Sequence, residues 1–249
     1  MRIKISMVSE GVQTIDINYN YHVSSFIYKC IDASDKGYSQ FLHDQGYVED
    51  NKGYKLFCFS MLIAENYKVD GSNFIIDGKV DLYVTSPMKK FLMAFVDIIA
   101  MNPDVKIGNG SFRITNIETM IEPDFRDEMR FRCLSPVAMA TAVLGENEKL
   151  KKIDLYLEDK KYAENIRMNL ISKYKILFGR EPDNTEINIE FMNIEKFKRG
   201  KRIQYKDNVS IKGYLAPFKM KGSTELMKVA YECGLGDRNS LGLGMIETI

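Results

Sequence analysis

Residues 231–247, YECGLGDRNSLGLGMIE, place four glycines between a predicted helix and a predicted strand. Residues 223–233 before them carry apolar side chains at helical spacing behind a Ser/Thr cap, which predicts a helix. The apolar run 243–246 after them predicts a strand. Nucleotide-cofactor loops run in the opposite order, strand then loop then helix, so that the helix N-terminus faces the phosphate. This order, together with the lack of Gly-Lys-Ser/Thr in the sequence, excludes a dinucleotide loop and a P-loop.

The glycines of this loop leave two interpretations open. A loop that is dense in glycine lets backbone N–H groups approach a phosphate closely, because glycine has no Cβ. The same composition also suits a flexible connector between a helix and a strand. The four residues concerned are Gly234, Gly236, Gly242 and Gly244.

The charge of the chain is unevenly distributed. The 249 residues, 45% of them hydrophobic, are enough for one large domain or two small ones, and the net charge is +1. Residues 196–221 contain nine Lys/Arg and one acid, about +8, which leaves about −7 for the rest. Such an asymmetry indicates a localised site for a polyanion.

The cysteines and the apolar runs bear on the compartment. The four cysteines are widely spaced, with neither a CxxC motif nor a Cys/His metal pattern. With no predicted signal peptide, they indicate reduced core thiols of a cytoplasmic protein. The longest apolar run, residues 91–101, contains Asp97 and is too short to span a bilayer, so no membrane association is expected.

Periodic patterns predict two units of similar element order. In the first we expect strands at 2–8, 12–17, 55–64, 74–85 (turning at Asp77-Gly78) and 105–120 (turning at Asn109-Gly110), with helices at 21–31, 36–45 and 86–101. In the second we expect strands at 129–134, 138–144, 149–157 and 187–197, a helix at 159–178, and a hairpin at 203–220 before the C-terminal helix and strand. This order predicts an α+β protein with two tandem ferredoxin-like (βαββαβ, RRM-like) domains, residues 1–122 and 123–249.

The densest basic stretch is residues 196–206, KFKRGKRIQYK. Lys and Arg neutralise phosphates, and interleaved aromatic residues such as Tyr205 offer bases a stacking surface. The alternative is a solvated surface hairpin. RNA is favoured over DNA only by analogy with other paired βαββαβ sheets. The cations of the stretch are Lys196, Lys198, Arg199, Lys201, Arg202 and Lys206.

Three residues in the first half are candidates for proton transfer and charge stabilisation. His43, one of two histidines, lies in FLHDQG, and histidine can move a proton at neutral pH. Tyr28 lies one residue off the apolar stripe of the first helix, and Lys55 begins the following strand. Each can equally be structural. The sequence has no HExxH, DxD or Cys/His quartet and no G-x-S-x-G elbow, so we expect no metal, no cofactor and no serine-hydrolase chemistry.

Several stretches together resemble one family, the CRISPR-associated endoribonucleases that cut precursor CRISPR RNA within its repeats, in the RAMP superfamily. The order and spacing of these stretches hold over nearly the whole chain. They are GLGDRNSLGLGMIE (234–247), FRCLSP (131–136), KLFCFS (55–60) and FIY (26–28) followed by LHD (42–44).

The resemblance implies two tandem ferredoxin-like domains and a metal-independent cut that leaves a 2′,3′-cyclic phosphate and a 5′-OH. By motif, the tyrosine, histidine and lysine of the family site fall on Tyr28, His43 and Lys55. Which of His43 and Tyr28 is the base stays open. Lys55 is preferred to Lys52 because it directly precedes Leu-Phe, although the spacer 47–53 is longer than the family pattern.

The resemblance also implies the partner, which is the repeat of precursor CRISPR RNA. The interdomain cleft and the glycine loop would face that RNA, with the cations of residues 196–206 and Arg238 on its phosphates. An alternative is a non-catalytic RAMP-type RNA-binding subunit, whose partners would be other subunits of a CRISPR interference complex; a general tandem RNA-binding module is a third reading. Homodimerisation is left undecided.

Overall fold

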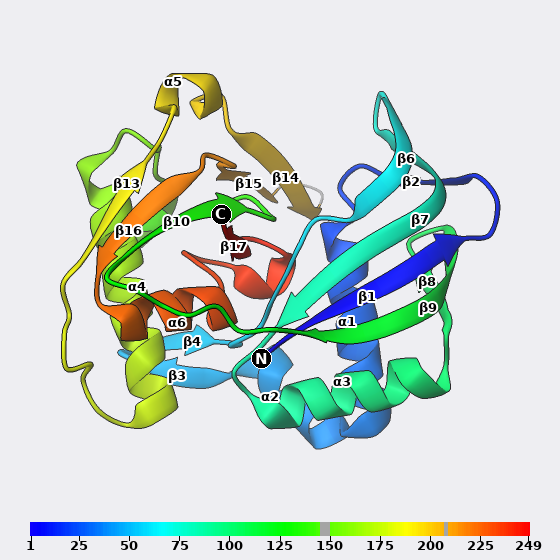
Figure 1. Cartoon of the computed structure of the whole chain (residues 1–249), viewed down its shortest axis with the longest axis horizontal. Coiled ribbons are helices and arrows are strands. Elements are labelled where there is room, and N and C mark those ends of the chain that lie inside the picture. The colour runs from blue at the N-terminus through cyan, green and yellow to red at the C-terminus, as the bar shows by residue number, and fades with distance from the viewer. Residues whose placement is uncertain (145–149, 207–208) are drawn as a thin grey trace.

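The computed structural model describes residues 1–144, 150–206 and 209–249. Figure 1 shows two lobes side by side, each a sheet with helices behind it, and the C-terminal glycine loop in red between them. The first sheet is made of residues up to 120 and the second of residues from 128 on. The proposed domain boundary at residues 122 and 123 lies in the segment that crosses between the two sheets.

The first lobe has the strand order β2-β7-β1-β9-β8, and both β5 and β6 also pair with β7. The path β6-β7-β1-β9, antiparallel throughout with α1 and α3 as its crossover helices, is the ferredoxin-like arrangement. The elements of this lobe are β1 (Arg2–Ser9), β2 (Gln13–Asp16), α1 (Asn20–Ser34), α2 (Lys36–Asp44), β3 (Tyr47–Glu49), β4 (Lys52–Tyr54), β5 (Cys58–Phe59), β6 (Ile63–Asp70), β7 (Asn73–Thr85), α3 (Lys89–Met101), β8 (Asp104–Ile107) and β9 (Gly110–Met120).

The second lobe repeats this plan with the strand order β13-β16-β10-β17 and with α4 and α6 as its crossover helices. Two separate hairpins, β11–β12 and β14–β15, are inserted into it. Its elements are β10 (Glu128–Cys133), β11 (Ala140–Leu144), β12 (Leu150–Asp154), α4 (Lys160–Phe178), β13 (Ile187–Phe191), α5 (Ile194–Phe197), β14 (Lys201–Lys206), β15 (Val209–Gly213), β16 (Phe218–Gly222), α6 (Thr224–Cys233), the 3-10 turn η1 (Asn239–Leu241) and β17 (Ile246–Thr248). The predicted α+β fold of two tandem ferredoxin-like units is therefore confirmed.

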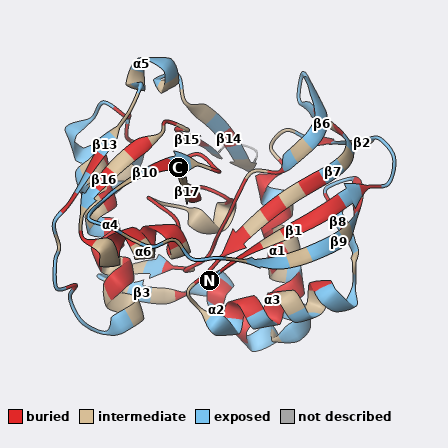
Figure 2. Ribbon diagram, viewed as in Figure 1, coloured by how far each residue is buried: buried red, intermediate tan, exposed pale blue. Residues whose placement is uncertain are grey.

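The burial pattern follows the sequence periodicity. Ile3, Ile5 and Met7 of β1 are at most 3% exposed, because alternate side chains of a strand point to the same face. Helix α4 ends where Gly179 adopts a left-handed conformation, and α6 begins where the side chain of Ser223 accepts a hydrogen bond from the N–H of Leu226. Figure 2 shows this pattern as alternating colours along the strands and as buried stripes on the helices.

Three local predictions were wrong. The predicted strand 55–64 is strand only at β5 and at the first two residues of β6, and Lys55 lies before β5 outside any strand. Asp77-Gly78 is not a turn but lies inside β7, where Gly78 (φ +85) sits opposite a register shift in the pairing with β6. A glycine in a strand can form a bulge as readily as a turn. The predicted strand 187–197 ends at Phe191, because Asn193 turns into a left-handed conformation and α5 follows. The Asn109-Gly110 hairpin is present, with Ile107 pairing with Gly110. The predicted 203–220 hairpin is present only as β14–β15, which ends at Gly213; residues 218–220 belong to β16, which pairs with β10 and β13. Residues 207–208 lie outside the described part.

A short hairpin of the first lobe packs into the second. Residues Tyr54 and Leu56, at and just after the end of β4, belong to the core of the second lobe. Glu49 of β3 lies 2.9 Å from the ammonium of Lys175 on α4. At the other side of the junction, the guanidinium of Arg2 donates to the carbonyl of Tyr231. The lobes are thus held together on both sides of the glycine loop.

The four cysteines are free, as the sequence predicted. Cys30, Cys58, Cys133 and Cys233 form no disulfide, and burial raises the pKa of each thiol to about 12, which keeps them protonated and unreactive. Within residues 1–144, 150–206 and 209–249, none of the helices combines the length and the apolar character needed to span a membrane.

Candidate active site

A cavity of about 620 Å³ opens where the two lobes meet. Its walls are α1, the end of α2, the β14–β15 hairpin and the glycine loop. Tyr28, His43 and Lys55 all line it, and Arg238 joins them from the glycine loop. None of the described residues that line it is an Asp or Glu. The site residues predicted from the family pattern are therefore brought together in a pocket suited to an anion.

Tyr28 is the most enclosed member of this group. Its ring packs nearly perpendicular to Phe57 and to His43, with centroids 5.7 and 6.2 Å away. Burial raises the pKa of Tyr28 strongly, the nearby Tyr205 raises it further, and a side-chain hydrogen bond with Ser240 acts in the opposite direction. The phenol therefore keeps its proton at neutral pH and is available as a donor.

His43 ends α2 with its side chain 78% exposed. Its Nδ1 lies 2.9 Å from a carboxylate oxygen of Asp44, and this hydrogen bond lowers the pKa of Asp44. A carboxylate can only accept, so Nδ1 carries the proton and Nε2 is left to exchange one. Asp44 was not singled out from the sequence, although it directly follows His43.

The chain between His43 and Lys55 folds into a hairpin, which brings the two residues together. Residues 47–54 form the β3–β4 hairpin, closed by the pairing of Tyr47 with Tyr54, so the long spacer returns Lys55 to the end of α2. The ammonium of Lys55 donates to the carbonyl of His43 at 3.0 Å, and burial lowers the pKa of Lys55. The contact is tight, since a Cβ on Gly46 (φ +68) would lie 3.0 Å from the Lys55 side chain. The alternative, Lys52, instead pairs with Asp237 at 2.6 Å.

The four loop glycines are buried and have positive φ angles. A Cβ on Gly242 would lie 2.3 Å from the ring of Phe59, and one on Gly244 only 1.9 Å from the carbonyl of Leu235. Gly234 and Gly236 have similarly close neighbours. Because these glycines have no Cβ, the loop can fit closely between the lobes. They affect the site by setting the backbone shape of the loop. Their contact with RNA stays a prediction.

A buried lysine of α4 holds the glycine loop in place. The ammonium of Lys173, on α4, donates to the carbonyls of Gly234 (2.7 Å) and Gly236 (3.1 Å) and to the side-chain oxygen of Asn239 (2.7 Å). Lys173 is 2% exposed, and this burial lowers its pKa to about 8. Sequence reasoning missed it; the available signal was a lysine within the apolar stripe of a long predicted helix.

The loop is also fastened to α1. The amide of Asn20 donates to the carbonyl of Leu241 at 3.0 Å, and the hydroxyl of Ser24 donates to the carbonyl of Ser240 at 2.9 Å. Arg238 adopts a left-handed conformation (φ +58), unusual for a residue with a Cβ. These contacts set Ser240 and Arg238 beside Tyr28.

Comparing the stability of the wild type and of Lys173→Met at different pH values should reveal the buried charge of Lys173. Since the pKa of Lys173 falls from its ordinary 10.5 to about 8 on folding, the unfolded chain holds more protons between those pH values. The free energy of unfolding should therefore rise with pH across this window, by up to about 3 kcal/mol from this group. Denaturant titrations at pH 7.5 and 10.5 should show that rise in the wild type relative to Lys173→Met.

Loop order provides the second readout for Lys173. Without the ammonium, two loop carbonyls and the Asn239 side chain lose their donor, so we expect the loop amides to exchange hydrogen about tenfold faster in Lys173→Met. Lys161→Met, on the exposed first turn of the same helix, is the matched control. Equal exchange in both variants would show that the loop does not need the lysine.

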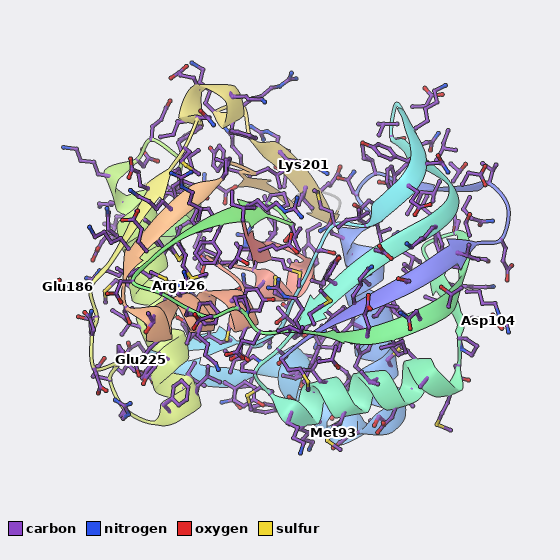
Figure 3. All side chains as sticks on the ribbon, viewed as in Figure 1. Met93, Asp104, Arg126, Glu186, Lys201 and Glu225 are labelled. Carbon is purple, nitrogen blue, oxygen red and sulfur yellow. The ribbon has the colours of Figure 1, made fainter. Side chains whose placement is uncertain are left out.

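Of the described residues of the basic stretch, only Tyr205 lines the cavity. Lys196, Lys198, Arg199 and Arg202 are exposed, and Lys198 forms an ion pair with Glu195. Lys201, labelled in Figure 3, has its ammonium 3.6 Å from the sulfur of Met61, and partial burial lowers the pKa of Lys201. The side chain of Lys206 lies outside the described residues. Tyr205 of this stretch lines the cavity, with its ring edge-to-face against Tyr21 of α1.

Comparison with protein families covers almost the entire chain. Residues 14–118 match the family described as CRISPR-associated protein Cas6, N-terminal, and residues 120–248 match CRISPR associated protein Cas6, C-terminal. The chain belongs to the CRISPR-associated Cas6 family. Full-length relatives agree. They include the CRISPR-associated endoribonuclease Cas6 1 of Methanocaldococcus jannaschii, 29% identical, with all of this chain and 93% of the relative covered.

Two further matches extend this to structures. The putative CRISPR-associated endoribonuclease-like protein Cas6 of Pyrococcus furiosus is 30% identical, covering all of this chain and 99% of the relative. A solved structure of a Cas6-related gene product from P. furiosus superimposes with a TM-score of 0.87 at 28% identity, covering 100% and 98% of the two chains. Another, described as an RAMP protein binding different RNA substrates, gives 0.85 at 26% identity, covering 100% and 99%.

Proposed function

We propose that this Cas6-family chain is an endoribonuclease that cuts precursor CRISPR RNA within its repeats. In this proposal the ribose 2′-OH attacks the adjacent phosphate without a metal ion and leaves a 2′,3′-cyclic phosphate and a 5′-OH. The observation that carries it is the meeting of Tyr28, His43 and Lys55 in one cavity whose described lining residues include no Asp or Glu. The names of its relatives, which are CRISPR-associated endoribonucleases, support the same substrate class.

Each residue has a role that suits its surroundings. Nε2 of His43, with Nδ1 bound to Asp44, takes the proton from the 2′-OH. Tyr28, whose pKa is raised, keeps its proton and donates it or a hydrogen bond to the leaving 5′ oxygen. Lys55 stabilises the extra charge that develops on the phosphate, and Arg238 contributes from the loop. These side chains supply the base, the acid and the positive charge that RNA transesterification needs.

The RNA path follows from the same surface. The exposed cations of residues 196–202 and Arg238 are proposed to bind phosphates, and Tyr205 and Tyr21 offer ring faces or edges to a base. Such binding weakens as salt increases. Neutralising Lys198, Arg199, Lys201 and Arg202 together should reduce both the affinity and its salt dependence.

Cleavage of the cognate repeat tests the proposed function. Purified protein is incubated in EDTA with repeat RNA from the CRISPR array of the same genome, and the product ends are analysed. We expect one cut, with a 2′,3′-cyclic phosphate and a 5′-OH. RNA that is bound but not cut, with stable co-purification of other subunits, would instead favour a non-catalytic RAMP subunit.

A pair of lysine variants tests the assignment of Lys55. We expect Lys55→Ala to lower the cleavage rate about 100-fold, because the developing phosphate charge loses its nearest cation. Lys52→Ala, which breaks the ion pair with Asp237, should cost less than about tenfold. Single-turnover rates with saturating enzyme separate this effect from binding. The reverse ranking would assign the role to Lys52.

A further inference from the structure

A second cavity, of about 540 Å³, lies on the other side of the glycine loop. It is bounded by β4 and the residues after it, by α4, by the β11–β12 hairpin and by residues 236–240 of the loop. It shares Lys55, Arg238 and Ser240 with the candidate active site. The two cavities are therefore neighbours, with these three side chains between them.

The lining of this second cavity is strongly positive. Among the described residues its lining contains five cations and one acid; the acid is paired with Lys52, and the ammonium of Lys173 already donates to the glycine loop. Asp237 accepts hydrogen bonds from the ammonium of Lys52 (2.6 Å) and the amide of Asn169 (3.3 Å). A space of this size and charge suits an anion as large as a nucleotide. The charged lining residues are Lys52, Lys55, Lys152, Lys173, Arg238 and Asp237.

Two polar atoms at this cavity have no partner among the described residues. Asn169 is 4% exposed. Its side-chain N–H donates to Asp237, and its Oδ1 accepts no hydrogen bond from the described residues. Nη1 of Arg238, which lies between the cavities, is likewise buried and unpaired. Buried polar atoms are nearly always hydrogen-bonded in folded proteins. Both atoms are shielded from solvent in the unbound protein, so the donor and the anionic group of a nucleotide would reach them only after the lining side chains shift.

We propose that the second cavity is a nucleotide subsite that holds the residue of the RNA strand adjacent to the scissile phosphate. Arg238 and Lys152 take its phosphate, and the edge of its base lies toward Asn169. The strand would thus pass over Lys55, with one neighbouring nucleotide in each cavity. This inference rests on the RNA-cleaving function proposed above.

Two adjacent lysines provide a matched pair for the test. Lys152 lines the cavity, while Lys151 does not, and both are exposed. In β12 they pair with Ala142 and Val143 of β11, so their side chains point to opposite faces of the hairpin. Lys152→Glu and Lys151→Glu change the net charge by the same amount at nearly the same place.

The probe is single-stranded repeat RNA in which 2′-fluoro groups replace the 2′-hydroxyls, so that the strand stays intact. One methylphosphonate at a time removes the charge of each phosphate, and dissociation constants are measured for wild type, Lys152→Glu, Lys151→Glu and Lys55→Ala. We expect Lys152→Glu to weaken binding about tenfold and Lys151→Glu less than about twofold. In Lys152→Glu, replacing one particular phosphate by methylphosphonate should no longer weaken binding. That phosphate should lie within about two nucleotides of the one whose replacement no longer weakens binding in Lys55→Ala.

The outcomes separate this subsite from the proposed function. Equal effects of the two glutamate variants, no coupled phosphate, or coupling at a distant phosphate would overturn the subsite. Because the RNA is not cut in this experiment, the result does not depend on catalysis. A protein that binds as expected but never cuts would retain the subsite and lose the proposed activity.

Discussion

Replacing the ribose on the 5′ side of the cut by deoxyribose should abolish cleavage, by a factor of about 10⁴ or more, while binding stays within about twofold. The reason is that the proposed nucleophile is removed, while the phosphates proposed to bind Lys55 and the basic stretch are unchanged. Single-turnover assays on repeat RNA with one deoxy sugar at the mapped cut site give the rate.

The control for this substitution is the same change one nucleotide to either side. Those substrates should be cut at nearly the normal rate, because their sugars do not take part in the reaction. Hydrolysis of the deoxy substrate at its usual position would mean that water is the nucleophile. The roles proposed for His43 and Tyr28 would then be wrong.

Replacing His43 by alanine should lower the rate of cleavage about 1,000-fold, with repeat affinity changed less than about threefold. The imidazole is largely exposed and makes its hydrogen bond with the adjacent Asp44, so its loss removes the proposed proton carrier without leaving a cavity in a core. The thermal midpoint should therefore shift by no more than about 2 °C. Rate and affinity are measured on the same preparation.

The other histidine of the chain is the matched control. His22 is also on a helix of the first lobe, but it packs against Gly108 and is not part of the cavity lining. We expect His22→Ala to cut at close to the wild-type rate. Added imidazole should restore part of the activity of His43→Gly and none of that of Lys55→Ala. Wild-type rates in His43→Ala would remove this residue from the mechanism.

The sequence predicted the helices and most of the main strands because their burial is periodic, but it placed a strand at 55–64 where the structure has β6 at 63–70. Two examples of periodic burial are the alternation of Ile3, Ile5 and Met7 and the capped apolar stripe of α6. Such local patterns can be recognised without knowledge of the tertiary contacts. The Asp77-Gly78 and 187–197 predictions failed because a bulge and a turn into α5 depend on which strand lies opposite. The family pattern, not periodicity, identified Tyr28, His43 and Lys55.

What could not be predicted is set by long-range contacts. Nothing near Lys173 in the sequence shows that its ammonium meets carbonyls some 60 residues later. In the sequence the β3–β4 hairpin appears only as an overlong spacer, because its contacts with α4 of the second lobe are not visible in a linear pattern. The second cavity depends on the same contacts, since it is formed by loop residues and by α4 together.

The seating of the β3–β4 hairpin has a consequence for protein engineering. Lys55 is encoded with the N-terminal lobe, yet the residues on either side of it, Tyr54 and Leu56, are anchored in the C-terminal one. A chimera that joins this N-terminal lobe to a relative's C-terminal lobe would break that anchorage and misplace the lysine. Crossover points for recombining members of this family should therefore keep residues 47–56 from the same parent as α4, even though that splits the first lobe.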